Sequence, residues 1–168
     1  MGAVRPTEST VRGGRQASVR FGAYRSIAMG RAPRVPTVLV LDDVPAIRLL
    51  LRQTLEARPL RVVEAGDVNI AWGLIAVERP ALIIMEPRIL GPDPLELCRA
   101  LRRDPATAST RVLVLTTATA EADLRRARDA GADAIMTKPF RPIRLLAMVD
   151  CLLAPHPDVQ RRASSGSS

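Results

Sequence analysis

Five short apolar runs, separated by longer segments of helical period, constrain the fold of this chain more than any other feature. Each run is rich in aliphatic residues and gives way to polar, Pro or Gly residues, as buried strands do. The runs occupy residues 37–41, 60–64, 81–85, 111–115 and 132–137, and the helical patterns occupy residues 45–55, 67–79, 95–103, 121–130 and 142–153. Repeated strand and helix units with short connections predict an α/β fold, in which helices cover both faces of one parallel sheet.

The charge separates a nearly neutral domain from two tails. Residues 1–35 contain seven Arg and one Glu without strand or helix period, so we expect a disordered basic arm. An alternative is that Met29 is the true start and residues 1–28 come from a start site placed too early. Residues 36–154 form the predicted domain, and the polar residues 155–168 form a predicted disordered tail. The length of 168 residues suits one domain with a real core.

Composition excludes several classes of protein. Cys98 and Cys151 lie in helical patterns, so we expect both to be small core residues of a reduced protein rather than a zinc site. No apolar run reaches the roughly 18 residues of a membrane span, and the N-terminus lacks a secretory signal. These features predict a cytoplasmic protein without a membrane partner. The basic arm could bind nucleic acid through phosphates, but this signal is weak and we do not expect nucleic acid as the main partner.

The helical patterns also predict which side chains are buried. In the first, the apolar stripe contains Ile47, Leu50, Leu51 and Leu55. In the second, the predicted buried side contains Ile70, Leu74, Ile75 and Val77, with Trp72 as a packing residue.

Reactive side chains follow four of the five predicted strands. Asp42 and Asp43 follow the first, Glu86 the third, Thr116 the fourth and Lys138 the fifth. The carboxyl ends of parallel strands share one edge of the sheet, where ligands bind in open α/β folds, so these side chains should meet there. Taken singly, Glu86 could be a solvated loop residue and Asp43 a helix cap.

The residue types at this edge suit one kind of chemistry. Clustered carboxylates repel each other unless a cation lies among them, and oxygen ligands with room for water suit Mg²⁺. A lysine and a hydroxyl are donors for phosphoryl oxygens. The combination predicts a site for handling a phosphoryl group.

The motifs at these strand ends resemble those of the receiver domains of two-component response regulators. They are Val-Leu-Val-Leu-Asp-Asp at 38–43, the acidic strand end at 86, Gly91 and Asp93, Leu-Thr at 115–116, Ala-Gly-Ala-Asp at 130–133 and Thr-Lys-Pro-Phe at 137–140. The resemblance covers residues 37–153 and implies a flavodoxin-like, doubly wound (βα)5 fold with strand order 2-1-3-4-5. It also implies a cis peptide bond at Lys138–Pro139.

Roles for the strand-end residues follow from the resemblance. It implies that Asp42, Asp43, the residue at position 86 and the backbone carbonyl of Arg88 bind Mg²⁺, and that Thr116 and Lys138 sense the phosphoryl group. The domain would then be regulatory and not an enzyme, and its partner would be a sensor histidine kinase or another signalling protein, without a small-molecule substrate.

Glu86 departs from the family, whose phosphate acceptor is an aspartate. Its carboxylate reaches about 1.5 Å further, and a displacement of about 1 Å can slow such chemistry roughly 100-fold. We therefore expect phosphorylation at Glu86 to be weak or absent, and the longer side chain to reach Lys138 and Thr116 in place of a phosphoryl group. Leu90, Pro94 and Ile135 also depart from the usual loop and aromatic switch residues.

The sequence thus predicts a stand-alone receiver-like protein that signals through protein contacts. The alternatives are a conventional phosphorylated single-domain response regulator and a nucleic-acid binder that uses the arm. The family's usual partner surface, the fourth helix, fifth strand and fifth helix, is also where a homodimer would form. Five arginines lie on this surface, namely Arg125, Arg126, Arg128, Arg141 and Arg144.

Overall fold

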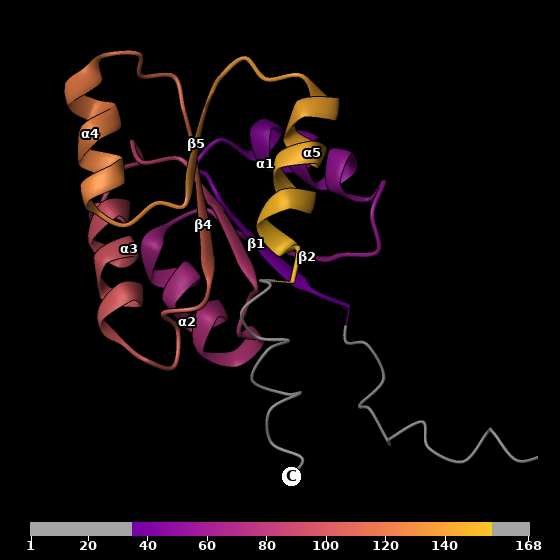
Figure 1. Ribbon diagram of the computed structural model, residues 1–168, viewed down its shortest axis with the longest axis horizontal. Coiled ribbons are helices and arrows are strands. Elements are labelled where there is room, and N and C mark those ends of the chain that lie inside the picture. Colours follow the sequence, from indigo (N-terminus) through magenta and orange to yellow (C-terminus); the bar gives the residue numbers. More distant parts are fainter. Residues whose placement is uncertain (1–34, 156–168) are drawn as a thin grey trace, which may run out of the picture. The chain divides into compact units, whose positions relative to one another are not determined.

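Residues 35–155 form a five-stranded parallel sheet with five helices (Figure 1). A computed structural model describes residues 35–155, so the predicted N-terminal arm and nearly all of the predicted tail lie outside the described residues. The elements are β1 (Thr37–Leu41), α1 (Pro45–Leu55), β2 (Arg61–Ala65), α2 (Val68–Glu78), β3 (Leu82–Met85), α3 (Pro94–Arg103), β4 (Arg111–Thr116), α4 (Glu121–Asp129), β5 (Ala134–Thr137) and α5 (Pro142–Leu153). The strand order is β2-β1-β3-β4-β5, which confirms the predicted flavodoxin-like fold.

The helices cover the sheet in two layers. One hydrophobic cluster packs α2, α3 and Ala127 of α4 on one face, and the other packs α1 and α5 on the opposite face. Because side chains alternate along a strand, β1 supplies Leu39 and Leu41 to the first cluster and Val38 and Val40 to the second. The central strands are therefore buried on both sides, as their continuous apolar runs predicted.

The register of the sheet aligns the strand ends. Leu41 pairs with Met85, and Thr116 pairs with Thr137. As a result, the residues that follow β1, β3 and β5 lie at one edge of the sheet, with the end of β4 between them.

Local signals set the ends of several elements. Asp67 caps α2, since its carboxylate accepts the Ile70 N–H at 2.9 Å. Helix α4 ends in a Schellman motif at Gly131, whose φ of 94° suits glycine. There the Gly131 N–H donates to Arg128 O, and the Ala132 N–H donates to Ala127 O. The Lys138–Pro139 peptide bond is cis, as the resemblance implied.

Four predictions of burial were wrong. Leu50, Ile70 and Val77 are 44%, 51% and 79% exposed. Ala71 and Val68 fill the core where Ile70 and Val77 were expected, because α2 is apolar on all sides and its sequence does not distinguish the inner from the outer face.

The fourth wrong prediction of burial concerns Cys151, which is exposed, while Cys98 is buried as expected. The last turn of α5 leaves Cys151 on its outer side, whereas Val149 and Leu145 face the core. Within residues 35–155, no helix is long and apolar enough to cross a membrane.

Candidate functional site at the carboxyl edge of the sheet

Three of the predicted site residues meet above the carboxyl ends of the strands. Asp42 follows β1 and is 2% exposed, and Glu86 follows β3 and is 7% exposed. Lys138 follows β5 and reaches across β4 to both carboxylates. Its Nζ lies 2.6 Å from Asp42 Oδ2 and 3.0 Å from Glu86 Oε2. One ammonium therefore bridges two buried acids from neighbouring strands.

Backbone N–H groups hold the other carboxylate oxygens. The Val44 N–H donates to Asp42 Oδ1 at 2.9 Å, and the Arg88 N–H donates to Glu86 Oε1 at 3.1 Å. Both acids thus have each oxygen engaged, which fits the rule that buried charges require partners. In the described part of the chain, no buried side-chain nitrogen or oxygen lacks a hydrogen-bond partner.

The surroundings of Lys138 raise its pKa. Burial is the largest single influence and lowers the pKa, but the hydrogen bonds and charges of Asp42 and Glu86 together outweigh it. A raised pKa means that the ammonium contributes stability fully below the ordinary value of 10.5 and loses it only as the pH rises through the higher folded pKa. Lys138 is therefore a fixed positive charge at neutral pH.

Asp43 takes a different position from Asp42. Its side chain is exposed and lines an open cleft of about 360 Å³ together with Asp42, Glu86, Arg88 and Lys138. It does not cap α1, because the residue at the cap position is Val44, which makes no side-chain cap hydrogen bond. Asp43 thus remains available at the mouth of the cleft.

The predicted Mg²⁺ ligands do not form a complete set as they are arranged. The donors are of the right chemistry, since they are oxygens. However, among residues 35–155 no three His, Cys, Asp or Glu side chains are grouped so that they could hold a metal ion. The oxygens of Asp42 and Glu86 already accept from Lys138 and from backbone N–H groups. In this arrangement Lys138 and backbone N–H groups hold the two buried carboxylates.

Thr116 is buried at the end of β4 but does not join this cleft. Its hydroxyl oxygen accepts the Ala118 N–H at 3.0 Å, and the residue lines a small hollow below α4. Among the described residues, no hydrogen bond links Thr116 to Glu86. Glu86 therefore reaches Lys138, as the sequence predicted, but not Thr116.

Two arginine side-chain contacts near the site were not predicted from the sequence. The Arg48 guanidinium of α1 donates to the Asp42 carbonyl at 2.6 Å. Arg88 forms an ion pair with Asp123 in the first turn of α4. This pair spans 35 residues and depends on a loop, so no local pattern predicts it.

Known proteins share this fold and these motifs. Residues 38–150 match the response regulator receiver domain family. The phosphate regulon transcriptional regulatory protein PhoB of Pseudomonas aeruginosa is 31% identical over 132 residues, which cover 79% of this chain and 55% of that protein. The DNA-binding dual master transcriptional regulator RpaA of Synechocystis is 36% identical over 119 residues, which cover 71% of this chain and 49% of that protein. The chain spans about half the length of these relatives.

Solved structures give the same result. The chemotaxis response regulator CheY4 of Vibrio cholerae has a TM-score of 0.66 and 28% identity, covering 71% of this chain and 99% of that one. The receiver domain of the Francisella response regulator 1452 has a TM-score of 0.64 and 26% identity. The match covers 70% of this chain and 95% of that one. Together with the strand order and the residues at the carboxyl edge, these matches show that the chain belongs to the response regulator receiver domain family of two-component signalling.

Proposed function

We propose that this receiver domain signals in the cytoplasm through protein contacts, with Glu86 and Lys138 holding its switch site in one state without phosphorylation. Receiver domains interact with histidine kinases and other signalling proteins, and they generally bind Mg²⁺ at the phosphorylation site. The observation that carries the proposal is the 3.0 Å contact between Lys138 Nζ and Glu86 Oε2.

The geometry of Glu86 supports weak or absent phosphorylation. An acceptor oxygen must be free to attack in line, and small displacements are costly. Here Oε2 is held by Lys138, while Oε1 accepts the Arg88 N–H. Glu86 is also only 7% exposed, so a phosphodonor would have to displace both partners to reach its carboxylate.

The same contacts support weakened Mg²⁺ binding. A divalent ion at Asp42 would compete with the Lys138 ammonium, which lies 2.6 Å from Oδ2. Ions of the same sign repel strongly at such distances. Only Asp43, at the mouth of the cleft, offers a carboxylate outside this network.

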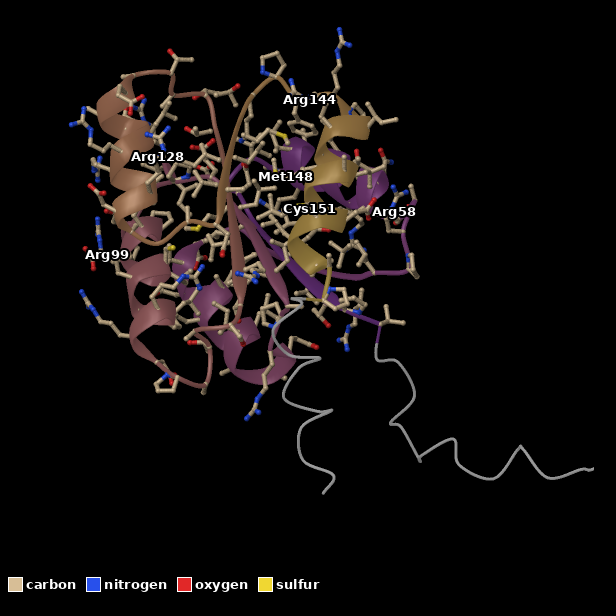
Figure 2. All side chains as sticks on the ribbon, viewed as in Figure 1. Arg58, Arg99, Arg128, Arg144, Met148 and Cys151 are labelled. Carbon is tan, nitrogen blue, oxygen red and sulfur yellow. The ribbon has the colours of Figure 1, made fainter. Side chains whose placement is uncertain are left out.

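The partner surface we propose is the face formed by α4, β5 and α5. It contains a cleft of about 380 Å³ whose lining includes Ile135, Phe140 and Met148. Arg128 of α4 and Arg144 of α5 line the same cleft, and Figure 2 shows these two residues with Met148. Arginines that line this cleft favour an acidic partner. The like charges of two copies disfavour a homodimer through this face.

Mass spectrometry tests the acceptor. The protein is incubated with acetyl phosphate and Mg²⁺, and its intact mass is measured. We expect the natural protein to gain no phosphoryl group and Glu86→Asp to gain one, because the shorter side chain withdraws from Lys138. Glu86→Gln is the matched control and should gain none. Stoichiometric phosphorylation of the natural protein would contradict the proposal and favour a conventional response regulator.

A further inference from the structure

Arg88 contacts both helix α4 and the switch site, which consists of Asp42, Glu86 and Lys138. Its backbone N–H donates to Glu86 Oε1 at 3.1 Å. Its guanidinium forms an ion pair with Asp123 in the first turn of α4. Arg88 belongs to the loop between β3 and α3, residues 86–93, so this loop joins the acceptor position directly to α4.

A second ion pair joins the same loop to α4 with the charges the other way round. Arg126 Nη2 of α4 lies 3.5 Å from Asp93 Oδ2. The other oxygen of Asp93, Oδ1, accepts the Leu95 N–H at 2.9 Å and so caps α3. Residues 123 and 126 are three apart and therefore lie on the same side of the helix. The loop contributes one base and one acid, and α4 contributes the complementary acid and base.

Helix α4 has few other attachments that fix its position. Its single buried residue is Ala127, and its N-cap residue, Ala120, makes no side-chain hydrogen bond. A hollow of about 20 Å³ remains between α4 and the loop. An exposed ion pair shifts an equilibrium only about 1.5- to 5-fold. That effect is small for a packed core, but it is large enough to bias the position of a helix that buries one residue.

The other polar side chains at the strand ends provide no alternative connection. The Thr116 hydroxyl accepts the Ala118 N–H, and in the described part of the chain it forms no hydrogen bond with Glu86. Lys138, the second partner of the Glu86 carboxylate, forms its ion pairs with Asp42 and Glu86. Within residues 35–155, Arg88 is thus the one residue bonded both to the Glu86 carboxylate and to α4.

We propose that Arg88 is a positioning residue through which the Glu86 carboxylate sets the position of α4. The inference rests on the proposed function, in which Glu86 holds the switch site and α4 forms part of the partner surface. The carboxylate keeps the Arg88 backbone in place, and with it the guanidinium beside Asp123. When the carboxylate is removed or drawn away, Arg88 loses this acceptor and α4 loses its anchor. A partner that binds α4 thereby responds to the state of Glu86.

Hydrogen exchange of the α4 amides, followed by NMR on the full chain, tests this role. Arg88→Met keeps the backbone N–H on Glu86 and removes only the ion pair with Asp123. We expect exchange in α4 to become about two- to fivefold faster relative to exchange in β3, which reports global unfolding. Arg99→Met removes an ion pair within α3 and is the matched control, which should leave α4 unchanged. Unchanged exchange in α4 of Arg88→Met would overturn the proposal.

Charge exchange separates the ion pair from general damage to the loop. Asp123→Arg places two arginines together and should speed exchange in α4 at least as much as Arg88→Met does. Arg88→Asp combined with Asp123→Arg restores the pair with its charges reversed, so exchange in α4 should return to within about twofold of the natural rate. A double variant that exchanges as fast as Asp123→Arg alone would contradict the role of the pair.

A double-mutant cycle tests the link to Glu86. Glu86→Ala removes the acceptor of the Arg88 N–H and should speed exchange in α4 relative to β3. In the Arg88→Met background the same change should have no further effect on α4, because the connection is already cut. An equal effect in both backgrounds would place the connection elsewhere and overturn the proposal. These measurements use no phosphodonor, so phosphorylation of Glu86 would contradict the proposed function without altering their outcome.

Discussion

Lys138 is the residue on which the candidate site depends. It is the only lysine of the chain, although the chain has many arginines. An ammonium is a compact charge with three donors, and it fits between Asp42 and Glu86 at 2.6 and 3.0 Å. The planar guanidinium of arginine is larger and requires a fork of acceptors. The chemistry of the site therefore explains why lysine occurs here.

Removal of the Lys138 ammonium should destabilise the whole domain. Lys138→Met leaves two nearly buried carboxylates without their cation, and breaking such a buried network costs about 3–5 kcal/mol. The loss would appear in urea unfolding at pH 7. Arg58→Met, which removes an exposed ion pair with Asp150, is the control and should change stability little. Equal losses of unfolding free energy in the two variants would show that Lys138 stabilises the domain no more than an exposed ion pair does.

At the scale of elements, the C-terminal end of α4 depends on Gly131. Its φ is 94°, and an added Cβ would lie 2.8 Å from Arg102 Cγ. Arg102 cannot easily move, because it donates to Gly131 O at 2.9 Å and Thr110 O at 2.7 Å. We expect Gly131→Ala to cost at least about 1–2 kcal/mol, measured by thermal unfolding. Gly73→Ala, inside α2 and with open space around the position, should stabilise the domain instead; a loss of stability there would contradict the argument.

The elements also show what the sequence can predict. The strands, their parallel order and the shared edge followed from apolar runs and short connections, because those patterns depend on local burial. The outer face of α2 could not be predicted, since a helix that is apolar on all sides lacks the hydrophobic periodicity that would identify its buried side. At the site, the meeting of Asp42, Glu86 and Lys138 was predictable from strand ends. The position of the Thr116 hydroxyl was not, because it depends on the loop before α4 and its Ala118 N–H.

At the scale of the molecule, both helical layers depend on the same three strands. Strands β1, β3 and β4 are almost entirely buried, whereas β2 and β5 have partly exposed residues throughout most of their length. Because β1 and β3 contribute alternate side chains to both hydrophobic clusters, neither layer can separate without exposing the core of the other. The domain should therefore unfold as one cooperative unit.

Native-state hydrogen exchange measures this dependence directly. The amides of β1, β3 and β4 should exchange only through global unfolding, and those of β2 and β5 through smaller openings with lower free energy. Edge strands have a sheet neighbour on one side only, and β5 also receives few contacts from its covering helix α4, whose single buried residue is Ala127. Equal protection of β5 and β3 would contradict this order. It would mean that the α4 and β5 region is held more rigidly than its packing provides, and that the proposed partner surface is fixed before any partner binds.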